Sequence, residues 1–98
     1  MMDMKKDNRR FPRRPVSFNV NVTFSNHQCA TFKAKDISRG GMYIASDDLE
    51  QPYIGELLHI KLVQEPNINE TIPYEDAVVV RKGQQGFGLS FVKMGDRL

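Results

Sequence analysis

The sequence predicts a mostly all-β fold, a small antiparallel barrel of six strands that follows a basic N-terminal segment. Three observations support this prediction. Short runs of alternating or continuous apolar residues recur along the chain and are separated by turn-forming residues, as strands require. No stretch of ten residues has the apolar spacing of an amphipathic helix, so we expect little or no C-terminal helix. The 98 residues have room for one hydrophobic core, and 40% of them are hydrophobic, which is enough for the chain to fold.

The clearest predicted strand covers residues 16–24, where apolar and polar side chains alternate with the period of a half-buried strand. Residues 25–27 predict a hairpin turn, and residues 28–35 predict a second strand. The single cysteine, Cys29, lies in this second strand and cannot form an intrachain disulfide. We expect its thiol to be buried and to serve packing.

Strict alternation along the second strand would direct Asp36 into the core and Ile37 into solvent. This placement is unfavourable, because burial of an unpaired carboxylate costs free energy whereas burial of isoleucine is favourable. We therefore expect a bulge or a strand end near residues 35–36, which turns the carboxylate toward solvent and buries Ile37. Irregularities of this kind favour binding sites.

The remaining predicted strands are short and apolar, and they cover residues 41–46, 57–63, 77–81 and 86–92. In the last strand, Phe87, Leu89 and Phe91 share the face that we assign to the core, whereas Gly86 and Gly88 lie on the other face. This glycine face has two interpretations. It admits the close approach of another backbone or of a flat ligand, or it allows tight curvature of the barrel.

The basic N-terminal segment contains Arg9-Arg10-Phe11-Pro12-Arg13-Arg14, which places four guanidinium groups within six residues. Six of the 14 lysines and arginines lie between Lys5 and Arg14, although the net charge of the whole chain is only +2. Guanidinium groups bind phosphate through forked, charge-assisted hydrogen bonds. The segment therefore predicts an anion site, and a solvated basic arm is the plainer interpretation.

A second motif follows the second predicted strand, where Asp36-Ile37-Ser38-Arg39-Gly40-Gly41 places a carboxylate and a hydroxyl two residues apart, before a glycine pair. A carboxylate accepts hydrogen bonds, as it would from the N–H edge of a guanine. The plainer interpretation is a turn in which Asp and Ser bond the local backbone and glycine supplies a positive φ. Together the two motifs fit a phosphorylated guanine compound.

These motifs resemble the signatures of the PilZ domain family, bacterial receptors for cyclic di-GMP, which carry RxxxR in an N-terminal arm and (D/N)xSxxG after a strand. The matching residues are Arg9 and Arg13 for the first signature, and Asp36, Ser38 and Gly41 for the second. Arg10 and Arg14 form an alternative frame of the first signature. The resemblance implies a PilZ-type barrel, and we divide the chain into a flexible basic arm, residues 1–15, and a PilZ-like β-barrel domain, residues 16–98.

The resemblance also implies a function, that of a cyclic di-GMP receptor or adaptor without catalysis. The ligand-binding residues that it implies are Arg9, Arg10, Arg13, Asp36, Ser38, Gly40 and Gly41. In this interpretation Arg9 and Arg13 hold phosphates and guanine edges, and Asp36 accepts hydrogen bonds from a guanine. Ser38 bonds base or phosphate and Gly41 allows the turn, while Arg10 is assigned an auxiliary role toward a second, stacked ligand molecule.

We expect the arm to be mobile without ligand, because it has little apolar surface to bury, and to become ordered on binding. A protein effector of unknown identity would then recognise the ordered surface. The family suggests control of motility, of adhesion and biofilm formation, or of polysaccharide production. The first residues do not form a secretory signal, and no run of 18 apolar residues occurs, so we expect a cytoplasmic protein without membrane insertion.

Other function classes receive less support from the residues. His27 and His59 are isolated, and Asp36 with Ser38 lacks a suitably placed base, so the sequence predicts no enzyme. One cysteine and two scattered histidines predict no metal site, and we expect no cofactor apart from the ligand. Two alternatives stay open: a small nucleic-acid-binding β-barrel, and a PilZ-like protein-interaction module that does not bind ligand. The first is less favoured because the candidate stacking aromatics are scattered, and the second because the arginine motif is present.

Overall fold

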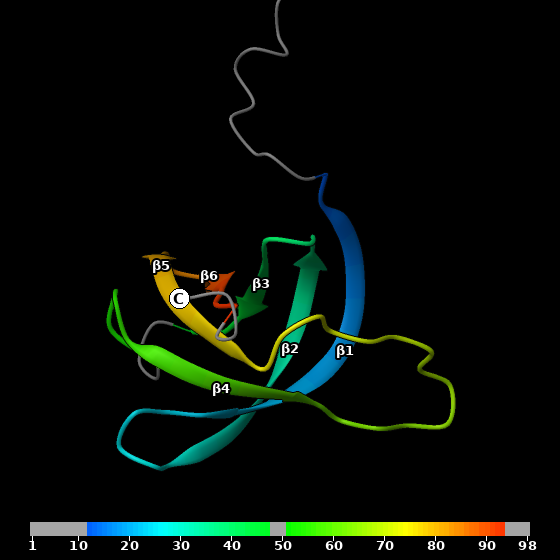
Figure 1. Cartoon of the computed structure of the whole chain (residues 1–98), viewed down its shortest axis with the longest axis horizontal. Helices are drawn as coiled ribbons and strands as arrows, with labels where there is room; N and C mark the ends of the chain where they lie inside the picture. Colours follow the sequence, from blue (N-terminus) through cyan, green and yellow to red (C-terminus); the bar gives the residue numbers. More distant parts are fainter. Residues whose placement is uncertain (1–11, 48–50, 94–98) are drawn as a thin grey trace, which may run out of the picture.

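Six antiparallel strands close into a barrel in the computed structural model, which describes residues 12–47 and 51–93 (Figure 1). The strands are β1 (Arg14–Thr23), β2 (Cys29–Ile37), β3 (Gly41–Ala45), β4 (Leu57–Leu62), β5 (Asp76–Lys82) and β6 (Gly86–Phe91). Their order around the barrel is β1-β2-β3-β6-β5-β4, and pairing of β1 with β4 closes it. The part of the chain that the structure describes contains no helix, and therefore also none that is long and apolar enough to cross a membrane. The predicted all-β, six-stranded barrel is confirmed.

The core is filled by the apolar side chains that alternate along the strands. On β1, Phe18, Val20 and Val22 are at most 2% exposed, and the asparagines between them face outward. Aromatic rings also pack together, since the ring of Phe32 on β2 meets those of Phe24, just after β1, and Phe87, on β6, edge-on at centroid distances of 6.1 and 5.6 Å.

The bulge predicted near residues 35–36 is present in β2. Ala34 lies opposite Ile44, but Asp36 lies opposite Tyr43, so β2 contains one more residue than β3 at this point. Ala34 and Ile37 are therefore both buried, although three positions separate them, and Asp36 lies on the outer surface. The prediction that Ile37 turns inward and Asp36 turns outward is confirmed.

The first strand begins at Arg14, two residues before the predicted start. Arg14 pairs with Ile37 and Pro15 with Asp36, and a second register shift follows between Pro15 and Phe18. A proline is tolerated here because it stands next to the first residue of the strand and beside an irregularity. The pairing brings the chain just before β1 next to the bulge of β2.

The prediction that Cys29 is buried is wrong. The side chain is exposed, and its Sγ lies 3.4 Å from the hydroxyl oxygen of Thr23. The reason is the alternation of β2: Ala34 and, in part, Ala30 and Phe32 face the core, so a residue at an odd position before the bulge must face outward. The thiol is a surface group.

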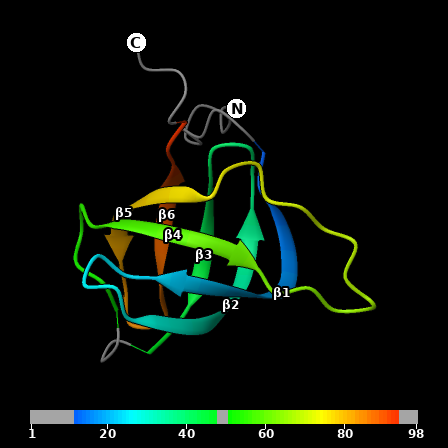
Figure 2. The ribbon, with the colours of Figure 1, turned by 60° about the horizontal axis from the view of Figure 1, so that its bottom comes forward.

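The segment between β4 and β5 projects from the barrel wall in two views of the molecule (Figures 1 and 2). Ile68 and Ile72, in this segment, are partly buried against the core. The backbone N–H of Val63 donates to the carbonyl of Asn19 at 3.0 Å, which holds the start of the segment to β1. At its far end, just before β5, the Glu75 carbonyl accepts a hydrogen bond from the Ile60 N–H of β4 at 2.7 Å, which holds this end of the segment beside β4.

Among the described residues, Glu56 is the one buried charged residue, with 6% of its surface exposed. Its Oε2 accepts hydrogen bonds from the Ser25 backbone N–H at 2.9 Å and the Ser25 hydroxyl at 2.8 Å, and its Oε1 accepts from the Tyr53 N–H at 3.2 Å. Burial raises the pKa of the Glu56 carboxyl, but these hydrogen bonds together outweigh burial and hold the pKa below its ordinary value. The carboxylate therefore fastens the β1–β2 hairpin to the segment before β4.

We expect Glu56→Gln to lower the free energy of unfolding by about 1–3 kcal/mol at pH 7, because the amide replaces one accepting oxygen with a donor. Since the folded pKa lies below the unfolded one, the contribution of the carboxylate is complete above the unfolded pKa, near 4.5. It is lost as the pH falls through the folded pKa. Urea denaturation of both proteins from neutral to acid pH measures the difference. A difference that does not shrink in acid would contradict the assignment, and Glu65→Gln at an exposed position is the control.

Candidate functional site

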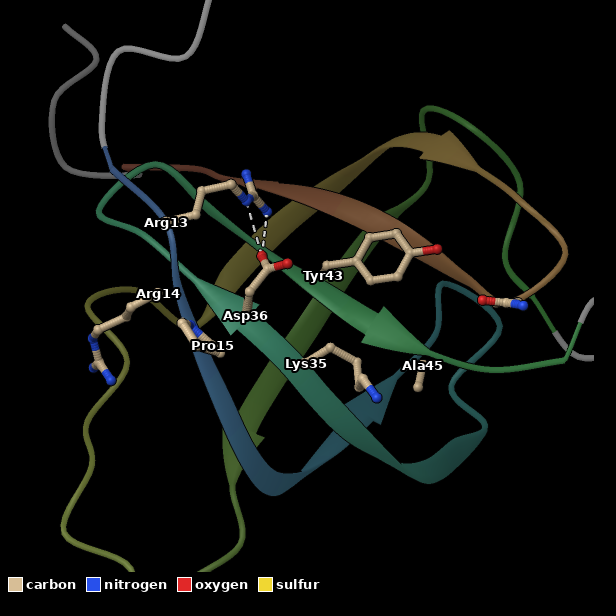
Figure 3. Close-up of a pocket in the computed structure, with 8 residues that line it drawn as sticks. Arg13, Arg14, Pro15, Lys35, Asp36, Tyr43 and Ala45 are labelled. Carbon is tan, nitrogen blue, oxygen red and sulfur yellow. Dashed lines mark hydrogen bonds and ion pairs between the residues drawn. The ribbon is translucent and has the colours of Figure 1, made fainter. Parts of the chain in front are cut away.

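The centre of the candidate site is an ion pair between Arg13 and Asp36. Arg13 stands immediately before β1, and Asp36 lies on β2 beside the bulge, so the pairing of Pro15 with Asp36 brings them together. The Arg13 Nε and Nη2 atoms lie 2.9 and 2.7 Å from the same carboxylate oxygen, Oδ1 (Figure 3). The two side chains are 18% and 33% exposed. Because the pair is partly shielded from solvent, salt screens it less than a pair on the open surface.

An open cavity of about 590 Å³ adjoins this ion pair, within the range of volumes that hold small molecules. The residues that line it come from the chain around the start of β1, from β2 and β3, and from the β5–β6 turn. They are Arg13, Arg14, Pro15, Lys35, Asp36, Tyr43, Ala45 and Gln85. Two predicted site residues, Arg13 and Asp36, are thus brought together at one cavity.

Arg14 lies on the other side of β1 from Arg13 (Figure 3). Its Nη1 and Nη2 donate to the two carboxylate oxygens of Glu70 at 3.2 and 2.8 Å. These hydrogen bonds raise the pKa of Arg14 and lower the pKa of Glu70. The bidentate pair attaches the β4–β5 segment to the start of β1, and it gives two neighbouring arginines different partners.

Ser38, Gly40 and Gly41 form the turn between β2 and β3. The Ser38 backbone N–H donates to the Gly41 carbonyl at 2.9 Å, and the Ser38 hydroxyl oxygen accepts from the Gly40 N–H at 3.1 Å. The part of the plainer interpretation that concerns Ser38 is therefore present, whereas Asp36 bonds Arg13 instead of the local backbone. Ser38 lines a second cavity of about 390 Å³, which it shares with Arg13 but not with Asp36. The structure thus places the carboxylate and the hydroxyl at two cavities, with Arg13 and Arg14 at both.

Gly41 is required by close packing rather than by backbone conformation. Gly55 is the one glycine with a positive φ among those described, so Gly41 does not supply one. A Cβ at Gly41 would overlap the carbonyl oxygen of Leu89 on β6. The expectation that a glycine here supplies a positive φ for the turn is wrong, and the approach of β6 to β3 is the physical reason for the residue.

Tyr43 is a cavity residue that the motifs did not identify as part of the site. It lies directly opposite Asp36 in the β2–β3 pairing. The alternation of residues 41–46 places Tyr43 on the outer face between the buried Met42 and Ile44, and a turn over residues 38–41 would have paired it with Asp36. This signal was available in the sequence. Lys35 and Gln85, by contrast, reach the cavity through the bulge and the β5–β6 turn, which local patterns do not position.

The glycine face of β6 is covered by side chains of this chain. A Cβ at Gly86 would lie 2.8 Å from Cε2 of Tyr43, and a Cβ at Gly88 would lie 3.1 Å from Nε of Arg81. The close approach predicted for this face is therefore made by the backbone of β3, at the Ile44 carbonyl oxygen, and by the side chains of a tyrosine and an arginine.

Arg9 and Arg10 lie outside the described residues, so the structure does not test the expectation that the arm becomes ordered on binding.

The histidines take no part in the candidate site. His27 adopts a φ of 73° in the β1–β2 turn, and His59 on β4 lies 3.2 Å from Asp76 and 3.5 Å from Glu75. Within the described ranges, no three His, Cys, Asp or Glu side chains are grouped in a way that could hold a metal ion.

Two comparisons with known proteins, by family and by structure, agree with each other. A model of the PilZ domain matches residues 7–98. The structure is similar to that of the Bacillus subtilis inhibitor of motility, MotI/DgrA, with a TM-score of 0.66 and 21% identity over 89% of this chain. This chain spans 44% of the length of that protein. It is also similar to the PilZ domain of CeSA from a cellulose-synthesizing bacterium, with a TM-score of 0.59 and 18% identity over 84% of this chain and 82% of that one. A search of curated proteins gives no match.

We expect Gly41→Ala to lower the free energy of unfolding by about 1–3 kcal/mol, because the added methyl group meets backbone of β6 that cannot move aside freely. Gly83→Ala is the matched control, since a Cβ there has no atom closer than 3.9 Å and we expect a change within about 0.5 kcal/mol. Thermal and urea unfolding measure both values. Equal stability of the two variants would show that β6 does not approach β3 as described.

Proposed function

This chain belongs to the PilZ domain family, and we propose that it is a receptor for cyclic di-GMP that acts without catalysis. The observation that supports this proposal most directly is the Arg13–Asp36 pair beside a cavity of about 590 Å³. In this pair a positively charged group that donates hydrogen bonds, the Arg13 guanidinium, lies next to a negatively charged group that accepts them, the Asp36 carboxylate. A ligand that combines phosphates with guanine bases requires both.

The geometry of the pair suggests how the two residues share the ligand. Both Arg13 contacts reach Oδ1 of Asp36, so Oδ2 is available to accept from the N–H edge of a guanine. A guanidinium has five N–H groups, and those not directed at Asp36 can donate to a phosphate oxygen. Ser38, at the neighbouring cavity, would act on the other side of Arg13.

The different partners of Arg13 and Arg14 favour one frame of the arginine motif. Both arginines line the cavity, but the Arg14 guanidinium is engaged by both oxygens of Glu70, whereas Arg13 pairs with Asp36. We therefore propose that Arg9 and Arg13 contact the ligand and that Arg10 is auxiliary. Gly40 and Gly41 contribute through the turn that places Ser38.

We propose that ligand binding is read by a partner protein, in the cytoplasm, and that the basic arm becomes ordered in the process. One structural neighbour is named as an inhibitor of motility, and the other is a domain of CeSA from a cellulose-synthesizing bacterium. Motility and polysaccharide production are therefore the outputs that we propose to examine first, together with biofilm formation.

Calorimetric titration of cyclic di-GMP into the purified protein tests the proposal. We expect saturable binding to the wild type, and affinity about tenfold to a hundredfold weaker in Arg13→Ala, because hydrogen bonds to charged groups are lost. Arg9→Ala/Arg13→Ala is expected to abolish the heat of binding. Arg14→Ala should cost less than Arg13→Ala, and the reverse order would favour the alternative frame.

Two controls accompany this titration. Lys61→Ala, on the outer face of β4, removes the same charge at a position outside both cavities and should leave the affinity unchanged. GTP, as a competing ligand, should not displace cyclic di-GMP. Absence of heat with the wild type would overturn the proposal, and equal losses in Lys61→Ala and Arg13→Ala would reduce the effect to net charge.

A further inference from the structure

We infer that Tyr43 is a base-contacting residue of the cavity, whose ring stacks on one purine of the bound ligand and so adds to affinity. The inference rests on the proposed function, because it concerns the same cavity. It assigns a role to a residue that lies outside the arginine motif and outside the aspartate–serine motif.

The ring of Tyr43 is held against the barrel by the glycine face of β6. Tyr43 pairs with Gly88 across the β3–β6 ladder, and its ring leans toward Gly86, which pairs with Ala45. A Cβ at Gly86 would lie 2.8 and 2.9 Å from Cε2 and Cζ of the ring. A side chain at residue 86 would therefore crowd this ring, besides overlapping the Ile44 carbonyl oxygen of β3.

Arg81 contacts the same ring from β5, on the far side of β6. Its guanidinium carbon lies 6.0 Å from the centre of the Tyr43 ring, within the range of cation–π attraction. The side chain of Arg81 itself lies over Gly88, where a Cβ would be 3.2 Å from its Cγ. Two glycines thus make room for two side chains that support each other. A ring restrained in this way loses little conformational entropy when a ligand packs on it.

The position of the ring relative to the ion pair suits a planar base. Tyr43 and Asp36 are directly opposed on adjacent strands, so their Cβ atoms are about 4.5–5.5 Å apart. Figure 3 shows the ring beside Asp36, with its hydroxyl directed away from the carboxylate, and Tyr43 lines the cavity. A base whose edge hydrogen-bonds to Asp36 would lie along this ring. One hairpin then supplies both interactions with the base: Asp36 hydrogen-bonds to its edge, and Tyr43 stacks on its face.

Tyr43→Leu tests the inference by calorimetric titration with cyclic di-GMP. Leucine keeps an apolar side chain over Gly86 but removes the aromatic face, and we expect affinity about tenfold to a hundredfold weaker than that of the wild type. Tyr43→Phe keeps the face and should bind within about threefold of the wild type. Thermal unfolding of each variant verifies that the barrel is folded before titration.

Tyr74→Leu is a closely matched control. Tyr74 is also a half-buried tyrosine with a cation near its ring, since Lys93 Nζ lies 6.0 Å from the ring centre, but it packs against Phe91 and lines neither cavity at the ion pair. We expect this variant to bind as the wild type does. If Tyr43→Leu and Tyr74→Leu have the same affinity as the wild type, Tyr43 serves only to cover β6 and the inference is overturned.

A fluorescence measurement separates stacking from indirect effects. The chain contains no tryptophan, so Tyr43→Trp introduces a single indole at the cavity. Stacking of a guanine on this indole should quench its emission in a saturable way, at the concentrations of ligand that calorimetry gives for the same variant. Binding without a change in emission would contradict contact at residue 43. If the wild type itself does not bind cyclic di-GMP, the proposed function fails, whereas binding that is insensitive to residue 43 defeats only this inference.

Discussion

One extra residue in β2, at Lys35, determines the arrangement of the end of the barrel that carries the candidate site. Without it, the alternation that buries Ala34 would also bury Asp36 and expose Ile37. With it, the core gains the isoleucine, and the carboxylate stands on the surface beside Arg13 and opposite Tyr43. The bulge therefore serves stability and the site by the same displacement, because each residue beyond it changes face.

Much of the fold could be predicted from the sequence because its determinants are local. Alternation defined β1 and β2, the unfavourable burial of Asp36 indicated the bulge, and short apolar runs located the remaining strands. The failure at Cys29 arose because the thiol was judged by residue type, although its position relative to Ala30 and Phe32 already placed it outside. Contacts that depend on the closing of the barrel were not accessible in this way.

The pairing of β3 with β6 and of Arg14 with Glu70 joins residues that are far apart along the chain. Glycine at residues 41, 86 and 88 is explained by such long-range neighbours: the Leu89 carbonyl, the Ile44 carbonyl with the Tyr43 ring, and the Arg81 side chain. The sequence motifs identified Arg13, Asp36 and Ser38 as chemically suited to a ligand. They could not indicate that Arg13 and Asp36 bind each other, or that Ser38 lies at a separate cavity.

The closure of the barrel also limits the ways in which another protein can recognise it. Each of the six strands is hydrogen-bonded on both sides, since β1 pairs with both β2 and β4 and the remaining strands complete the ring. Within the described residues no strand is left without a partner on a whole side, so a binding partner could add a strand of its own only along the stretches outside the paired registers. Most of the surface that remains for recognition consists of side chains on the outer face of the barrel and of the segments that connect its strands. Specificity for a partner can then change by surface substitution, while the hydrogen-bonded framework stays the same.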